Sequence, residues 1–200
     1  NADGEVVYAK TTREGDCHAI GQLEIRVLET PGHTFDHVAY AIFDSEYPDK
    51  AVGVFTGDAL FVGDVGRTDF YPDRKREVAS LLFDSLHKIC DLGDQAIIYP
   101  AHGAGSVCGS GMADREFSTV GHERRNNPML QIEDRDAFID RKVNENHYQP
   151  PYFRLMEHLN LVGGEAAPRV LRPQPMSLGE LSSCDAGRVI DVRAPLAYAA

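Results

Sequence analysis

The sequence lacks several features that would assign it to common functional classes. No apolar run approaches the roughly 18 to 20 residues that a membrane-spanning helix needs, so no membrane partner is expected. Lysine and arginine number 20 against 31 aspartate and glutamate, which gives a formal net charge of −11. Since nucleic-acid-binding proteins normally present a basic face, this acidic balance argues against a nucleic-acid partner.

The four cysteines include no C-x-x-C pair, and they stand at Cys17, Cys90, Cys108 and Cys184. Their spacing excludes a zinc ribbon and favours a reducing compartment, so a cytoplasmic location is predicted. The chain opens on Asn1 with neither an initiator methionine nor a signal peptide, and we expect it to begin inside a longer protein. Its hydrophobic share of 42% is typical of a globular protein with a core.

What the sequence does contain is a series of short β-strand patterns. Residues 6–9 form a short apolar segment, and residues 22–27 alternate polar and apolar side chains as a half-buried strand does. Residues 38–43 and 52–55 are nearly continuous apolar runs, which suit strands covered on both faces. A further strand is predicted at residues 96–99.

Helical patterns separate and follow these strands. A helix is predicted after Pro72, with Asp73 as its cap and Gly93 ending it. One apolar stripe runs along it at three- and four-residue spacing, formed by Val78, Leu81, Leu82, Leu86 and Ile89. Two further helices are expected around residues 138–143 and 152–159. Strands and helices in this succession predict an α/β fold.

Composition changes near residue 163. Residues 163–186 contain a Gly-Gly pair and several prolines, which is typical of a linker. A new strand pattern appears at residues 188–192, and the last fourteen residues, 187–200, are too few to build a core. We therefore expect one domain over residues 1–162, a linker, and the beginning of a second domain.

Three polar segments follow predicted strands, and each sets a histidine or aspartate beside a glycine. They are Thr30-Pro31-Gly32-His33-Thr34, Thr56-Gly57-Asp58 and Pro100-Ala101-His102-Gly103. If those strands run side by side, the three side chains emerge at one edge of the sheet, where strand ends are rigid and loops give access. Imidazole with carboxylate favours zinc, iron or manganese, and two histidines with one carboxylate is the usual set in Fe(II) oxygenases. A single histidine after a strand is more often an ordinary loop residue, so the ordered triple carries the prediction.

With their preceding strand residues, these segments resemble the later metal motifs of the metallo-β-lactamase superfamily, in the family's order. The branch they resemble comprises glyoxalase II and the persulfide dioxygenases. Gly66-Arg67-Thr68-Asp69-Phe70 and residues 119–128 are similar to segments that follow the metal aspartate in persulfide dioxygenases. The resemblance covers residues 1–162 and implies the four-layer αββα metallo-β-lactamase fold, of which this chain would hold the C-terminal part.

Two features at the ends of the chain complete this resemblance. The superfamily's first metal motif, His-x-His-x-Asp-His, is absent, and we expect it upstream of Asn1. The chain would then hold only part of the ligand set and be inactive alone. Residues 187–193 are similar to the opening strand of a rhodanese domain, as in bacterial fusions of a persulfide dioxygenase with rhodanese modules.

The resemblance implies a role for each metal-motif residue. His33 and Asp58 would bind one Fe(II), with a third ligand from the upstream motif. His102 matches a ligand of the second metal in two-metal relatives. In a one-iron enzyme it would instead hydrogen-bond the substrate or an iron-bound water.

Three residues near these motifs have competing interpretations, and one interpretation is made for His147. Arg67 could hold the carboxylates of a glutathione-like substrate, or it could brace its loop by pairing with Asp64 or Asp69, which we favour. His37 is expected to hydrogen-bond behind the ligands or to cap a turn. Cys108 invites a role in sulfur chemistry, but a small loop residue is the preferred interpretation, and His147 is expected to lie in solvent.

The activity that the resemblance implies is oxidation of a thiol persulfide, such as glutathione persulfide, by O2 to sulfite and the free thiol. One Fe(II) per subunit would be the cofactor, and a fused rhodanese would suit sulfide detoxification. The alternative is a glyoxalase-II-like thioester hydrolase with zinc or a mixed two-metal centre, although Asp64 stands where those relatives often carry a cysteine. A scaffold without turnover is a third interpretation. The family resemblance favours a homodimer.

Overall fold

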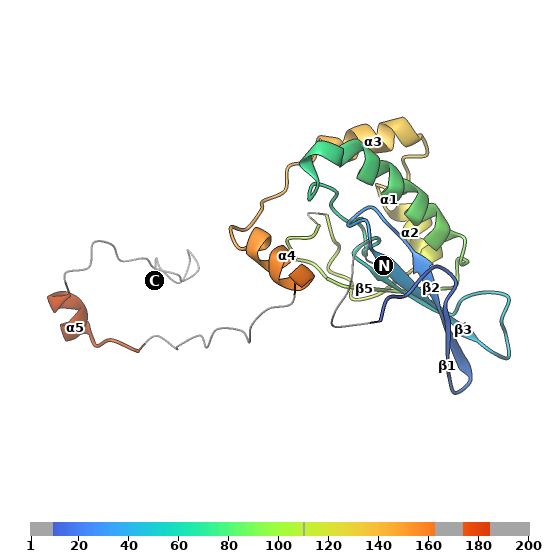
Figure 1. Cartoon of the computed structure of the whole chain (residues 1–200), viewed down its shortest axis with the longest axis horizontal. Coiled ribbons are helices and arrows are strands. Elements are labelled where there is room, and N and C mark those ends of the chain that lie inside the picture. The colour runs from blue at the N-terminus through green and yellow to red at the C-terminus, as the bar shows by residue number, and fades with distance from the viewer. Residues whose placement is uncertain (1–9, 110, 163–173, 185–200) are drawn as a thin grey trace. The chain divides into compact units, whose positions relative to one another are not determined.

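A six-stranded sheet organises the first part of the chain, with its strands in sequence order from edge to edge (Figure 1). The strands are β1 (Cys17–Ile20), β2 (Leu23–Glu29), β3 (Val38–Asp44), β4 (Gly53–Gly57), β5 (Ile97–Pro100) and β6 (Ser118–Thr119). Neighbouring strands pair antiparallel, except that β4 and β5 run parallel. A parallel pair needs a crossover connection, and helix α1 (Lys75–Cys90) supplies it.

This computed structural model describes residues 10–109, 111–162 and 174–184. The chain divides into two compact units, residues 1–163 and residues 164–200. The predicted strand at residues 6–9 and the rhodanese-like segment at residues 187–200 lie outside the described residues. No helix in the described ranges has the length and apolar character needed to cross a bilayer.

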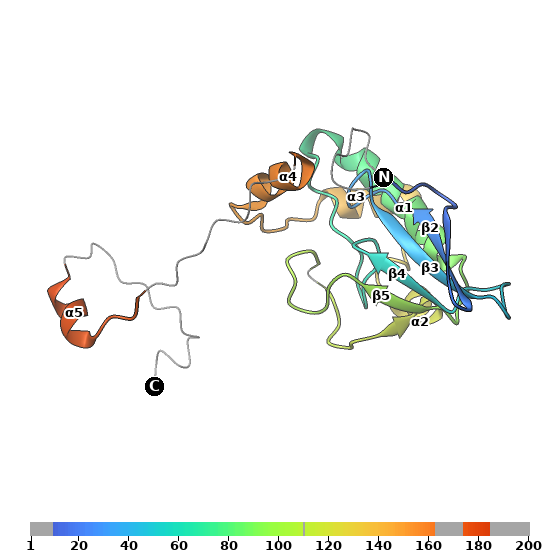
Figure 2. The same cartoon turned by 60° about the horizontal axis from the view of Figure 1, so that its bottom comes forward.

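Helices α1, α2 (Val120–Asn126) and α3 (Arg135–Val143) gather on one side of the sheet (Figures 1 and 2). Burial along β3 alternates, because side chains of a strand point to opposite faces in turn. One face of the sheet packs against the helices in a single core, which includes Ala39, Ala41, Val54, Ile98, Leu82, Leu86 and Phe138. The predicted α/β fold is confirmed.

The opposite face of the sheet is less well covered in the described structure. Phe55 of β4 and Tyr99 of β5 stack on it with ring centroids 5.3 Å apart, and they are 45% and 42% exposed. The prediction that both faces are covered is therefore wrong for residues 52–55, where Val52 and Phe55 are exposed, whereas residues 38–43 are buried or half-buried. Continuous apolar runs indicated burial, but they could not indicate that only one face meets helices.

Other boundaries differ from the sequence predictions for local reasons. A 3₁₀ turn at Pro72–Arg74 precedes α1, so Asp73 lies inside that turn and does not cap the helix. The strand β1 was missed because all four of its residues are exposed and give no burial pattern. It pairs with β2 through a turn at Gly21, whose φ of +61° favours glycine.

Two further helices follow the sheet unit. Helix α4 (Phe153–Val162) matches the predicted helix around residues 152–159, and it ends close to the boundary of the first unit. Helix α5 (Leu178–Ser183) lies within the predicted linker, so that segment is not devoid of structure. Its start is fixed by a capping box in which Ser177 and Glu180 satisfy each other's backbone amides.

Candidate metal centre

The three predicted metal-site residues meet at one edge of the sheet. Strands β2 and β4 are both antiparallel to β3, and β5 is parallel to β4, so all three end at the same edge. The loops that follow them carry His33, Asp58 and His102. Asp58 Oδ1 lies 3.1 Å from His102 Nε2 and 3.9 Å from His33 Nε2. The structure thus brings the three together, whereas their roles as ligands stay a prediction.

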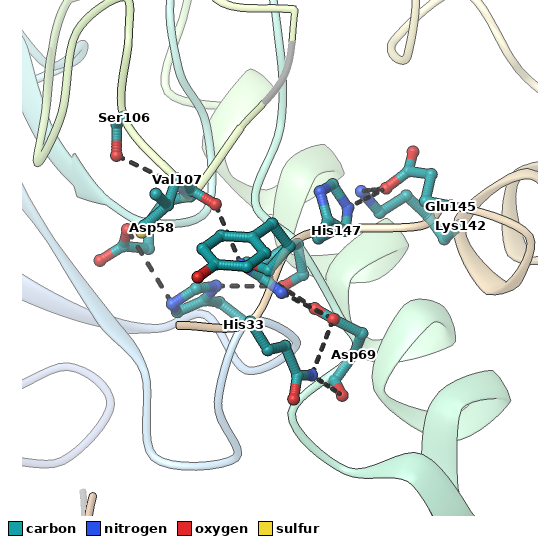
Figure 3. Close-up of polar contacts among 12 residues, drawn as sticks. His33, Asp58, Asp69, Ser106, Val107, Lys142, Glu145 and His147 are labelled. Carbon is teal, nitrogen blue, oxygen red and sulfur yellow. Dashed lines mark hydrogen bonds and ion pairs between the residues drawn. The ribbon is translucent and has the colours of Figure 1, made fainter. Parts of the chain in front are cut away.

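His33 is held with one ring nitrogen turned toward the aspartate (Figure 3). Its Nδ1 lies 3.0 Å from the carbonyl oxygen of Arg67, which can only accept, so Nδ1 carries the proton and Nε2 keeps a free lone pair. Phe70 meets the imidazole edge-on at 5.0 Å. Burial lowers the pKa of His33, although Asp58 opposes that effect. The ring is therefore neutral, which is the form that binds metals.

His37 fixes the backbone that carries Asp58. The amide of Asp58 donates to His37 Nε2 at 2.9 Å, and His37 Nδ1 lies 3.0 Å from the carbonyl oxygen of Thr30. Burial lowers the pKa of His37, which keeps Nε2 free to accept. Gly57 has φ of +55°, and a Cβ there would lie 2.5 Å from His37 Nε2. The predicted hydrogen-bonding role of His37 behind the site is confirmed.

The donor set fits a divalent metal ion. Asp58 Oδ1 is buried and has no hydrogen-bond partner among the described residues; the 3.1 Å approach of His102 is not a hydrogen bond. A buried oxygen left without a donor costs about 1–3 kcal/mol, and a bound cation would satisfy it. Two ligand atoms each about 2.1 Å from one ion stand roughly 3 to 4 Å apart, depending on the angle between them, and Asp58 Oδ1 lies within that range of both His33 Nε2 and His102 Nε2.

Cys108 belongs to the same cluster. Possible ligand atoms of Asp58, His102 and Cys108 all lie within 4.8 Å of one another. Burial raises the pKa of the Cys108 thiol, and the neighbouring Asp58 carboxylate raises it further. The preferred sequence interpretation gave Cys108 no role beyond its loop. Sequence distance from the motifs could not fix this position, because it depends on how the loop at residues 103–109 folds after His102.

Arg67 and Asp64 hold that loop in place. The Arg67 Nη1 donates to the carbonyl oxygen of Val107 at 3.0 Å, and Asp64 Oδ2 accepts from the Gly111 amide at 2.8 Å. Both contacts reach from the segment after β4, which carries Asp58. The position of Cys108 is therefore set by residues of the metal loop together with its own segment, in which the Cys108 amide donates to Ser106 Oγ at 3.1 Å.

The guanidinium of Arg67 is fully buried and braces its own loop. Its Nε and Nη2 donate to the two carboxylate oxygens of Asp69 at 2.6 and 2.7 Å. Burial would raise the pKa of Asp69, but hydrogen bonds from Arg67 and Gln149 outweigh burial and hold that pKa at about 2. The predicted pairing with Asp69 is confirmed, and that with Asp64 is wrong. A side chain with 0% exposure offers no surface for direct substrate contact in the described structure.

The segment at residues 119–128 supports the metal loop from the other side. Glu123 is fully buried and accepts hydrogen bonds from the Gly63 amide at 2.8 Å and from Asn127 Nδ2 at 3.0 Å. Ser118 Oγ donates to the same carboxylate at 2.5 Å. Asn127 also donates to the carbonyl oxygen of Asp64 at 3.1 Å. These contacts explain why Glu123 and Asn127 are buried although they are polar.

A groove of about 640 Å³ lies elsewhere, beside α1 and α3. Its apolar lining includes Phe83, Leu86, Met129, Leu130 and Phe138. Neither the metal-motif residues nor Cys108 line it. The metal cluster therefore does not open into this groove.

His147 was expected in solvent, and that prediction is wrong. Only 9% of its side chain is exposed, and its Nε2 lies 2.9 Å from Glu145 Oε2. The sequence gave no sign of this burial, because the flanking residues Asn146 and Tyr148 are polar or exposed.

The chain is similar in sequence to enzymes of known and distinct activity. Over 156 residues it is 31% identical to persulfide dioxygenase ETHE1 of Mus musculus, covering 78% of this chain and 54% of the relative. Over 118 residues it is 31% identical to hydroxyacylglutathione hydrolase GloC of Haemophilus influenzae, covering 59% of this chain and 46% of the relative. The chain thus spans about half the length of these relatives. No family model matches it.

Solved structures give the fold. A metallo-β-lactamase from Staphylococcus aureus aligns with a TM-score of 0.74 at 28% identity, covering 95% of this chain and 53% of that chain. ETHE1 from Myxococcus xanthus aligns with a TM-score of 0.63 at 32% identity, covering 80% of this chain and 63% of that chain. The chain has the metallo-β-lactamase fold, and its relatives in sequence and structure support its membership of the metallo-β-lactamase superfamily.

Proposed function

We propose that this chain is part of an iron-dependent persulfide dioxygenase that oxidises a low-molecular-weight thiol persulfide, such as glutathione persulfide. The observation that carries the proposal is the buried Asp58 Oδ1, which lacks a hydrogen-bond donor and faces Nε2 of His33. The likeness to ETHE1 proteins supports this branch, and it extends over more of the chain than the likeness to the hydrolase. The Arg67–Asp69 brace lies within the segment that resembles persulfide dioxygenases.

The reaction needs two oxygen atoms from O2 and one from water. In balanced form, RSSH + O2 + H2O gives RSH + SO3²⁻ + 2 H⁺, so the terminal sulfur is oxidised and the S–S bond breaks. Fe(II) would supply open positions where sulfur and O2 meet, which removes the entropic cost of a three-body encounter. His33 and Asp58 would hold that iron, with a third ligand from sequence upstream of Asn1.

The remaining residues of the site orient the two ligand groups and shield them from water. The Arg67 carbonyl and His37 fix the two ligand groups from behind, so the geometry is set before substrate arrives. Phe70 covers the His33 imidazole and limits access of water to it. His102, with 39% of its side chain exposed, stands where it can hydrogen-bond the substrate sulfur or a bound water.

A thioester hydrolase with two metals is the alternative. The 3.1 Å approach of His102 to the same Asp58 oxygen favours it, because these two side chains could together hold a second metal ion. The alignment with hydroxyacylglutathione hydrolase GloC supports it as well. In that case His102 would be a metal ligand, and zinc or a mixed pair would replace the single Fe(II).

Two substrates separate the two activities. The full-length gene product that carries these 200 residues is loaded anaerobically with Fe(II) and given either glutathione persulfide or S-lactoylglutathione. The proposal expects O2 uptake and sulfite in equal amounts with the persulfide, and no thioester hydrolysis. Hydrolysis of S-lactoylglutathione without O2 uptake on the persulfide would establish the alternative instead.

Three further proposals rest on the family resemblance. The protein would act in the cytoplasm as a homodimer, and a rhodanese module would continue from residues 187–200. Sedimentation of the full-length gene product tests the dimer directly. A sulfurtransferase assay with thiosulfate tests the rhodanese module.

A further inference from the structure

A cluster of three ionisable side chains, one buried and two half-buried, lies at the end of α3 and in the segment that follows it. Lys142 Nζ donates to Glu145 Oε2 at 2.6 Å, and His147 Nε2 lies 2.9 Å from the same oxygen. Their side chains are 1%, 19% and 9% exposed, respectively. A lysine this deeply buried is unusual, and it is tolerated because the carboxylate partners it.

The residues that follow this cluster contact the arginine of the metal loop. Arg67 Nη1 donates to the carbonyl oxygen of Tyr148 at 3.1 Å, and Gln149 Nε2 donates to Asp69 Oδ2 at 3.0 Å. Figure 3 shows Lys142, Glu145 and His147 to one side of the view, and His33 and Asp58 to the other. The segment at residues 144–149 therefore forms hydrogen bonds with both members of the Arg67–Asp69 pair.

The cluster is built to hold that segment in one conformation. Burial would raise the pKa of Glu145, but its contacts with His147 and Lys142 outweigh burial and lower the pKa, so the carboxylate stays ionised. One carboxylate oxygen contacts both partners. Loss of that carboxylate would leave the Lys142 ammonium buried without a counter-charge, and the segment would have to open to hydrate it.

A chain of direct contacts continues from Arg67 to the metal residues. The Arg67 carbonyl fixes His33 Nδ1, and its guanidinium fixes the Val107 carbonyl beside Cys108. Arg67 has two donors to Asp69 and only main-chain acceptors for its Nη1 group, namely Val107 and Tyr148. Displacement of the Tyr148 carbonyl would deprive the buried Arg67 Nη1 group of one of its hydrogen-bond acceptors, and the guanidinium could then shift.

We propose that Lys142, Glu145 and His147 form a positioning cluster, which holds the Tyr148 carbonyl on Arg67 and the Gln149 side chain on Asp69 and thereby fixes His33 and the Val107 loop relative to Asp58. None of the three contacts the metal residues, so they act through Arg67. The inference rests on the proposed function only where it takes His33 to be a metal ligand; the placement of the Val107 loop does not depend on any metal.

The test compares Glu145→Ala with two control variants on α3. Ile139→Ala removes a buried apolar side chain of the same helix, and Asp140→Ala removes the exposed partner of Arg76 with the same change of charge. Hydrogen–deuterium exchange of the full-length gene product in its metal-free form is followed at residues 144–149, 66–70 and 103–109. We expect Glu145→Ala to speed exchange about tenfold or more in all three ranges, and the controls to leave residues 66–70 and 103–109 unchanged.

A second readout uses Co(II), a redox-stable probe with a visible spectrum. Loss of a group that orients metal ligands typically weakens metal binding 10- to 100-fold, so Glu145→Ala should raise the Co(II) dissociation constant by about tenfold or more. Glu145→Gln keeps an acceptor oxygen without the charge, and it should give intermediate exchange and affinity. That variant decides the question if Glu145→Ala does not fold.

Exchange that rises only at residues 144–149, or rises equally in the Ile139→Ala control, would overturn the proposal. The same holds if Glu145→Ala and Glu145→Gln both exchange at residues 103–109 as the unsubstituted chain does. Failure of the unsubstituted full-length gene product to bind Co(II) would count against the proposed metal function instead. The exchange data would still show whether the Lys142–Glu145–His147 cluster positions Arg67.

Discussion

Replacement of Asp69 by asparagine tests how the metal loop is braced. Arg67 would keep its charge while fully buried, and its bidentate partner would become neutral. Removal of one member of a buried ion pair costs about 3–5 kcal/mol. Because the asparagine oxygen still accepts one hydrogen bond and Asp69 is 13% exposed, we expect a loss of about 2–4 kcal/mol in the free energy of unfolding at pH 7.

The pKa of Asp69 gives this prediction a pH dependence of known sign. The folded pKa is about 2 against an ordinary value of 3.8, so the ionised form is favoured in the folded state. At about 1.36 kcal/mol per pKa unit, the carboxylate contributes roughly 2 kcal/mol of stability above pH 5. That contribution fades as pH falls through 3.8 toward 2, and about half is gone by pH 3.

Urea denaturation of both proteins between pH 7 and pH 3 measures the effect. The difference between the unsubstituted chain and Asp69→Asn should be largest at pH 7 and shrink by about 1 kcal/mol at pH 3. Asp140→Asn is the control, because the Arg76–Asp140 pair is 60% and 62% exposed and solvent screening leaves it little effect on stability. Equal stability of Asp69→Asn and the unsubstituted chain at every pH would refute the bracing role of Arg67.

Two further substitutions test the supports of the site. His37→Ala leaves the Asp58 amide and the Thr30 carbonyl without their partner, so calorimetry should show a free energy of unfolding about 2–4 kcal/mol lower. A Co(II) titration should show binding at least tenfold weaker. Unchanged Co(II) affinity would show that His37 does not support the site. Gly32→Ala would place a Cβ 2.5 Å from the backbone of Leu82 at a φ of +143°. Thermal unfolding should show a free energy of unfolding lowered by about 1–3 kcal/mol or more. The control is Gly103→Ala, whose Cβ would meet nothing within 4 Å and which should change stability by less than about 0.5 kcal/mol.

The approach of His33, Asp58 and His102 could be predicted because each signal is local. Each residue follows a short apolar strand and sits beside a glycine, and strands that run the same way end at the same edge. The hydrogen bond of His37 followed from the strand-like residues after it. These features need no knowledge of long-range packing.

The contacts that support the site could not be predicted, because they join segments far apart in the chain. Arg67 reaches Val107 and Tyr148 across 40 and 81 positions. The spacing of Lys142 and Glu145 fits an ordinary exposed helical pair, and only the packing shows that the lysine is buried. Likewise, the apolar runs in β3 and β4 do not reveal which face the helices cover.

The metal content of single-residue variants tests directly whether His33 and Asp58 hold a single Fe(II). The full-length gene product and its His33→Ala, Asp58→Ala and His102→Ala variants are loaded anaerobically with Fe(II), desalted, and measured for iron per chain. We expect one iron per chain in the unsubstituted protein, loss of that iron in His33→Ala and Asp58→Ala, and its retention in His102→Ala. Two metals per chain, or full retention of iron in His33→Ala, would contradict it.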